Sequence, residues 1–115
     1  MKNSFDCEFG CPIEITMAVI GGKWKVAILF HLLNGKLRFM ELKKLLPGIS
    51  QRVLTVQLRE LEADKIISRK VFPEVPPRVE YNLTAFGKSL APTLLEMGKW
   101  GEKYAGKVRK LKEKL

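Results

Sequence analysis

Residues 51–64 combine an apolar face with a polar face, and this segment constrains the fold more than any other. On a helix with about 100° between residues, Leu54, Leu58 and Leu61 fall in one narrow arc. Ser50 precedes the segment, where its hydroxyl suits a helix N-cap. We predict a helix over 51–64 that buries these leucines. Its adjoining arc carries Gln51, Arg52, Thr55, Val56 and Arg59.

Two segments rich in β-branched and aromatic residues follow, residues 66–72 and 78–83, and they predict a β-hairpin. The residues between them, 73–77, read Pro-Glu-Val-Pro-Pro and cannot donate ladder hydrogen bonds at the prolines. We therefore expect a stiff, protruding tip, flanked by Arg69, Lys70 and Arg78. A polar-faced helix followed by a basic hairpin is typical of a winged helix-turn-helix. In that arrangement the helix enters the major groove of DNA and the hairpin reaches the neighbouring backbone or minor groove.

Apolar periodicity predicts three shorter helices upstream, at about 12–20, 23–33 and 40–46, with an extended piece over 37–39. Pro12 suits the first position of its helix because a proline there loses no hydrogen bond. A final helix is predicted over 84–112, capped by Thr84. The expected fold class is mainly α with a small β-hairpin, a winged helix-turn-helix in one domain spanning residues 1–115.

Apolar residues recur at spacings of three or four along the last predicted helix, in a stripe longer than a small domain covers by itself. We expect this stripe and the helix over 12–20 to pack against a second copy of the chain. Gly98, Gly101 and Gly106 lower helix propensity in the middle, which allows a break or a close helix crossing there. The residues predicted to form the dimer are Ile13, Met17, Leu94, Met97, Trp100 and Tyr104.

The charge balance favours a polyanionic partner. Lys and Arg number 21 against 12 Asp and Glu, giving a net charge of +9, and nucleic acid is the commonest polyanion. No segment has the apolar length of a membrane span, and residues 1–10 lack a signal-peptide pattern, so we expect a cytoplasmic protein. Two cysteines and one histidine, His31, make a poor metal set. With no nucleophile motif either, we expect no metal, no cofactor and no enzymatic activity.

Several long motifs occur in one order: residues 11–14 (CPIE), 20–25 (IGGKWK), 48–52 (GISQR), 58–62 (LRELE) and 73–81 (PEVPPRVEY). Together they resemble the HxlR-type family of winged-helix transcriptional regulators, relatives of the MarR group, over about residues 11–104. The resemblance implies a homodimer that binds a pseudo-palindromic operator in double-stranded DNA, usually as a repressor. The residues that it and the helical wheel place at DNA are Ser50, Gln51, Arg52, Thr55, Arg59, Lys70, Pro76, Pro77 and Arg78.

Cys11 matches a position that some family members use as a thiol sensor. A thiol just before Pro12 lies at a helix N-terminus, where unpaired N–H groups favour the thiolate, whereas the nearby Asp6, Glu8 and Glu14 disfavour it. A disulfide would join Cys11 to Cys7, to a second subunit or to an outside thiol. The alternative to thiol sensing is an inert cysteine at the subunit interface. Two alternatives concern function: the DNA-binding dimer is controlled by a small-molecule ligand in an interface pocket, or the winged helix binds protein without operator specificity.

Overall fold

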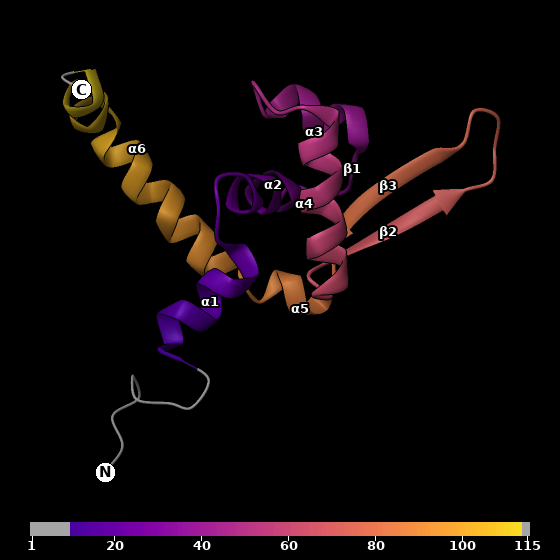
Figure 1. Cartoon of the computed structure of the whole chain (residues 1–115), viewed down its shortest axis with the longest axis horizontal. Helices are drawn as coiled ribbons and strands as arrows, with labels where there is room; N and C mark the ends of the chain where they lie inside the picture. Colours follow the sequence, from indigo (N-terminus) through magenta and orange to yellow (C-terminus); the bar gives the residue numbers. More distant parts are fainter. Residues whose placement is uncertain (1–9, 114–115) are drawn as a thin grey trace, which may run out of the picture.

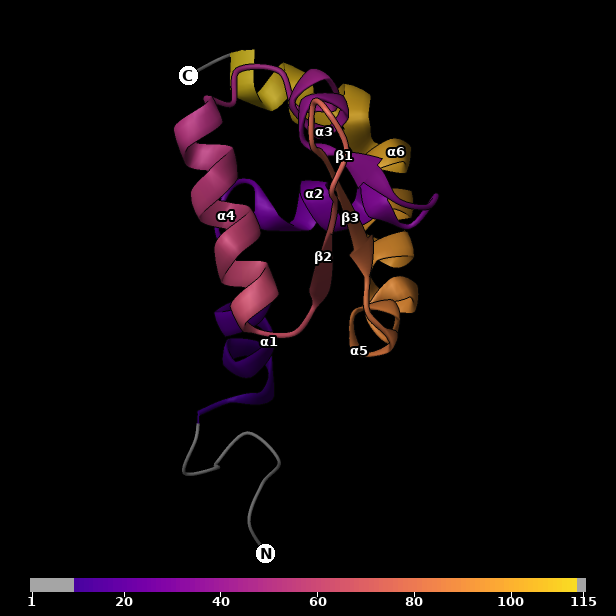
Figure 2. The ribbon, with the colours of Figure 1, turned by 90° about the vertical axis from the view of Figure 1, so that its right-hand side faces the viewer.

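Helices enclose one face of a small antiparallel sheet in the computed structural model, which describes residues 10–113 (Figure 1). Figure 2 shows α4 and α6 on opposite sides of the body, with α2 and the sheet between them. The elements in chain order are α1 (Pro12–Ile20), α2 (Lys25–Leu32), β1 (Leu37–Arg38), α3 (Phe39–Leu45), α4 (Gln51–Ala63), β2 (Ile67–Phe72), β3 (Arg78–Leu83), α5 (Ala85–Lys88) and α6 (Ala91–Glu113).

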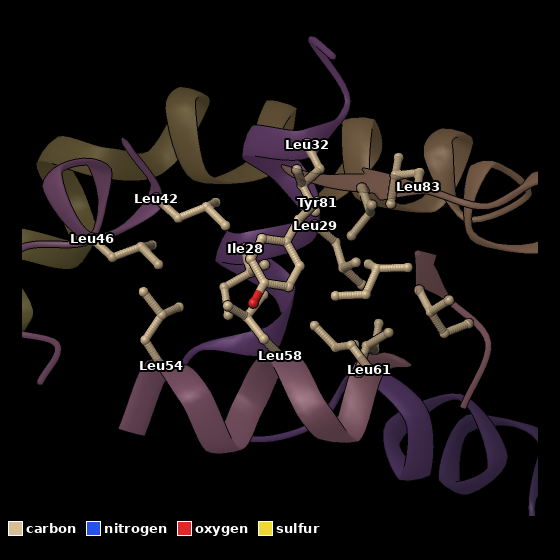
Figure 3. Packing of buried hydrophobic residues seen from close by; sticks show 14 of the residues in the cluster. Ile28, Leu29, Leu32, Leu42, Leu46, Leu54, Leu58, Leu61, Tyr81 and Leu83 are labelled. Atoms are coloured by element: carbon tan, nitrogen blue, oxygen red, sulfur yellow. The ribbon is translucent and has the colours of Figure 1, made fainter. Parts of the chain in front are cut away.

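The core lies where α4 meets α2, α3 and the sheet. Leu54, Leu58 and Leu61 point inward from α4, as the wheel predicted, and each is at most 1 % exposed. Opposite them lie aliphatic side chains of α2 and α3 and the inward residues of β3 (Figure 3). Burying this apolar face is what holds α4 against the body, because side chains of this size each contribute about 1.5–3 kcal/mol when fully buried.

The sheet has three strands in the order β1-β3-β2, so the predicted hairpin gains a partner. In the hairpin Ile67 pairs with Leu83 at one end and Phe72 with Arg78 at the other. The extended piece expected at 37–39 becomes β1, in which Leu37 pairs with Tyr81. The extended conformation was predicted, although Phe39 begins α3 instead; the pairing with β3 was not predicted, because two residues give no sign of their partner strand.

The last helix differs from its prediction. Instead of one helix over 84–112, the chain forms α5, capped by Thr84 through a 2.9 Å hydrogen bond from the Gly87 N–H, and then α6. Between them Ser89 and Leu90 donate to carbonyls three residues back. Pro92 accounts for the break, because it has no N–H and its ring would clash with the carbonyl four residues earlier in a continuous helix.

α6 itself runs unbroken through its three glycines. Gly98 is the site of a close helix crossing: a Cβ atom there would lie 2.9 Å from Cε1 of Phe30 on α2. Leu94, predicted at a subunit interface, is instead buried in the core of its own subunit at 1 % exposure. Leu94 therefore faces the core of its own subunit rather than an exposed stripe.

Candidate nucleic-acid interface

The turn between α3 and α4 sets the start of the exposed helix. Gly48 has a φ of +88°, a conformation that residues with a side chain rarely adopt. Ser50 then caps α4, accepting a 3.1 Å hydrogen bond from the Val53 N–H. The capped first turn leaves the side chains of Gln51 and Arg52 exposed at the end of the helix.

The outward face of α4 carries the polar residues that the wheel selected. Gln51, Arg52 and Arg59 are exposed, and Thr55 is half-buried. The Thr55 hydroxyl donates to the Gln51 carbonyl at 2.8 Å, and the Gln51 amide lies 3.9 Å from the Met40 sulfur. The side chains of Arg52 and Arg59 make no such hydrogen bond within residues 10–113. This face offers guanidinium and amide groups of the kind that make bidentate contacts to base edges.

Neither arginine on this face has a carboxylate partner among residues 10–113, whereas several cations of the body do. Lys25 Nζ lies 2.7 Å from Glu60 Oε1 and ties α2 to α4. Arg69 Nε lies 3.5 Å from Glu62 Oε1 and ties β2 to α4. Sequence spacing gave no signal for either pair, because the partners come together only through packing. The positive charge left uncompensated on α4 is therefore that of Arg52 and Arg59.

The hairpin tip is braced by its own side chains. The Arg78 guanidinium stacks 3.9 Å from the centre of the Phe72 ring and lies 3.4 Å from carboxylate oxygens of Glu74 and Glu80. Lys70 approaches the same ring at 4.9 Å and makes no ion pair in the described residues. Pro76 and Pro77 are exposed at the tip. Lys70 and Arg78 were both predicted to contact DNA. Of the two, only Arg78 pairs with carboxylates in the described residues, and these contacts stiffen the hairpin.

A groove of about 260 Å³ separates α4 from β2, and its walls include Thr55, Arg59, Arg69 and Tyr81. Tyr81 is 9 % exposed, and its hydroxyl points toward α4 (Figure 3). Burial raises the pKa of the Tyr81 phenol, while the positive charges of Arg69 and Arg59 oppose that rise. Tyr81 was not among the residues predicted for the site, although the alternation of Val79, Tyr81 and Leu83 along the strand indicates that its side chain faces inward.

The terminal helices expose apolar side chains. Ile13 and Met17 of α1 are 66 % and 49 % exposed, and Met97 and Trp100 of α6 are 46 % and 60 % exposed. Trp100 and Tyr104 lie with ring centres 5.1 Å apart. A groove of about 350 Å³ runs between the two helices and is lined by Ile13, Met17 and Met97 among others. The structure thus brings the predicted dimer residues to one surface, apart from Leu94.

Cys11 is the N-cap residue of α1, half-buried, and its carbonyl accepts the Ile15 N–H at 3.0 Å. Cys7 lies outside the described residues. Within residues 10–113, no group of three or more His, Cys, Asp or Glu side chains is placed to hold a metal ion. No helix in that part of the chain has the length and apolar character needed to cross a membrane.

Comparison with known proteins agrees with this architecture. The sequence model of the HxlR-like helix-turn-helix family matches residues 19–109. The uncharacterized HTH-type transcriptional regulator YdeP of Bacillus subtilis is 57 % identical over 102 residues, which cover 89 % of this chain and 80 % of YdeP.

Solved structures agree as well. The redox regulator HypR in its reduced form superposes with a TM-score of 0.81 at 50 % identity, covering 86 % of this chain and 98 % of HypR. Its oxidized form gives 0.79 at 55 % identity, covering 81 % and 96 %. A MarR-family regulator from Porphyromonas gingivalis W83 gives 0.79 at 40 % identity, covering 89 % and 97 %. Fold, exposed α4 face and relatives together show that the chain belongs to the HxlR-like helix-turn-helix family of transcriptional regulators, which are not enzymes.

Proposed function

We propose that the protein is a homodimeric repressor that binds a pseudo-palindromic operator, with α4 of each subunit in a major groove. The observation that carries the proposal is the outward face of α4, where Arg52 and Arg59 are exposed and have no carboxylate partner in the described residues. An unpaired guanidinium is free to make bidentate contacts to guanine, each worth about 1–3 kcal/mol of discrimination.

The remaining DNA contacts follow from the geometry around this face. Ser50 and the first N–H groups of α4 suit a phosphate at the helix N-terminus. Gln51 and Thr55 lie beside Arg52 on the outward face, where an amide suits adenine and a threonine methyl suits thymine. Lys70, Pro76 and Pro77 of the hairpin meet the neighbouring backbone, and Arg78 holds them in position. Lys70 adds affinity that depends on salt rather than on sequence.

Homodimerisation is supported by the exposed apolar surface of α1 and α6. A surface helix that leaves Met97 46 % and Trp100 60 % exposed gains free energy when a second copy covers them. Pairing two copies through this surface would also give two recognition helices for two half-sites, as operator symmetry requires.

Binding to the DNA upstream of the protein's own gene tests this function. The purified protein is titrated by fluorescence anisotropy against that duplex and a scrambled one, at several salt concentrations. We expect selective binding with dimer stoichiometry and a steep fall in affinity with salt. Arg52→Ala should lose about 1–3 kcal/mol of selectivity, and Arg52→Lys should keep affinity for the scrambled duplex while losing selectivity, because lysine cannot form the bidentate fork.

The matched control is Lys88→Ala, an exposed lysine on α5, which should leave selectivity unchanged. Equal affinity for the upstream and scrambled duplexes at every salt concentration would contradict binding at this site. In that case the operator lies elsewhere or the winged helix binds a protein.

Thiol control through Cys11 is a second element of the proposal. The similar protein HypR is a redox regulator whose oxidized and reduced forms have both been solved. Here Cys11 occupies the N-cap position of α1, near the exposed Ile13 and Met17 that we assign to the dimer surface. Oxidation of two thiols to a disulfide, with diamide taking up the two electrons and two protons, would shift α1 and change the spacing of the recognition helices.

Cys11→Ser tests the thiol. We expect diamide to change operator affinity of the wild type and not of the variant, with Cys7→Ser showing whether Cys7 is the disulfide partner. An identical response of the wild type and Cys11→Ser to diamide would rule Cys11 out. If both proteins respond equally, Cys7 is the responding thiol. If neither responds, a small-molecule ligand in the groove between α1 and α6 is the remaining means of control.

A further inference from the structure

The cations of the chain differ in how many carboxylates lie near them. The end of α6 has the fewest. Residues 103–112 contain five cations, Lys103, Lys107, Arg109, Lys110 and Lys112, and no Asp or Glu. None of the five makes an ion pair within residues 10–113. By contrast, Lys99 earlier in the same helix pairs with Glu96 at 3.1 Å. The end of α6 is thus a basic surface separate from α4 and the hairpin.

Repulsion within this segment costs stability. Lys103, Lys107 and Lys110 follow one another at spacings of four and three, so they line one face of the helix. Like charges at such spacings destabilise a helix by a few tenths of a kcal/mol per pair. All three are exposed. Glu113 lies three residues after Lys110, yet none of the three lysines makes an ion pair within residues 10–113, so an external anion would relieve their repulsion.

The position of this end relative to α4 indicates which anion. Figures 1 and 2 show the last turns of α6 at the same level as the N-terminal end of α4 and the hairpin tip. In Figure 2, α6 starts on the side of the body opposite α4 and slants toward the α4 side as it approaches its C-terminus. In Figure 1 that end lies on the far side of α4 from the hairpin. The three basic features are therefore spread along one end of the subunit.

We propose that the end of α6, through Lys107 and Lys110 above all, is a further DNA-binding surface that holds backbone phosphates between the two half-sites of the operator. The inference rests on the proposed function. With the apolar faces of α1 and α6 paired in a dimer, the hairpins lie outermost and the ends of α6 lie between the recognition helices. Phosphates there would supply the anions that residues 103–112 lack. Such contacts raise affinity and its salt dependence without adding base preference.

The test compares two double variants of the full-length protein. Lys107→Gln/Lys110→Gln removes the proposed phosphate-binding charges, and Gln has nearly the helix propensity of Lys. The matched control, Lys65→Gln/Lys88→Gln, removes the same charge at exposed positions beside α5, at the end of the body opposite the hairpin tip (Figure 1). Circular dichroism checks that both variants remain folded. Affinity for the upstream duplex is then measured as a function of salt.

We expect the slope of log K against log salt to become shallower by about 0.9 for each phosphate that is no longer neutralised, and so by up to about 4 for the four lysines of a dimer. The control pair should change it much less. Ethylation interference should show that the phosphates released by the variant lie between the half-sites. Equal slopes for the two double variants, or an unchanged pattern of interference, would overturn the inference while selective wild-type binding still stands. Wild-type protein that fails to select the duplex would instead contradict the proposed operator at this site, a result distinct from the failure of the inference about α6.

Discussion

Replacing Ser50 by Ala removes the only side-chain acceptor that we find at the start of α4 within the described residues. The Ser50 hydroxyl oxygen lies 3.1 Å from the Val53 nitrogen, and Ser50 is exposed. Loss of an N-cap costs about 0.5–2 kcal/mol. Because water reaches this helix end and replaces part of the hydrogen bond, we place the loss near the lower part of that range, at about 1 kcal/mol.

Thermal unfolding followed by circular dichroism measures this loss. For a chain of 115 residues, 1 kcal/mol corresponds to a fall in Tm of about 4 °C. Ser50→Asn is the control, since asparagine caps about as well as serine and should leave Tm within about 1 °C of the wild type. All measurements use one protein concentration, because the Tm of the proposed dimer would depend on it.

DNA binding separates the cap from the phosphate contact. Fraying of the first turn displaces Gln51 and Arg52, so Ser50→Ala should weaken operator binding up to about fivefold, the equivalent of 1 kcal/mol. Ser50→Asp keeps the cap and favours the helix dipole, yet it puts a negative charge where we expect phosphate. It should therefore match or exceed the wild type in Tm and still bind DNA more weakly. A Tm unchanged by Ser50→Ala, or full DNA affinity in Ser50→Asp, would refute this reasoning.

Two further predictions concern other surfaces. Trp100→Glu puts a charge on the exposed apolar face of α6, so sedimentation should show a shift from dimer to monomer, whereas Val75→Glu at the hairpin tip should leave the dimer intact. A dimer that survives Trp100→Glu would contradict the assigned surface. Burial raises the pKa of Tyr81, so the folded state holds the phenolic proton more tightly than the unfolded chain. The unfolding free energy should fall as pH rises above about 10, and Tyr81→Phe should lessen that fall. Equal alkaline slopes in both proteins would exclude Tyr81 as the cause.

Local signals predicted α4 and the hairpin well. The Ser50 cap, the leucine arc of α4 and the proline-rich tip depend on residues within a few positions of one another, where sequence spacing maps directly onto geometry. The break before α6 also had a local signal in Pro92, which the long apolar stripe outweighed. From that stripe Leu94 was predicted to lie at the dimer surface, but in the folded chain it is buried in the core.

Pairings between distant segments could not be read in this way. Spacing along the chain carries no information on which carboxylate meets Lys25 or Arg69, because Glu60 and Glu62 reach them only when α4 docks on α2 and β2. The same holds for β1, whose two residues become a strand only beside β3. Which cations remain free is therefore a property of the packed molecule. Sequence spacing selected Arg52 and Arg59 as candidates, and packing left them without carboxylate partners in the described residues, because the nearby acidic side chains pair with cations on other elements.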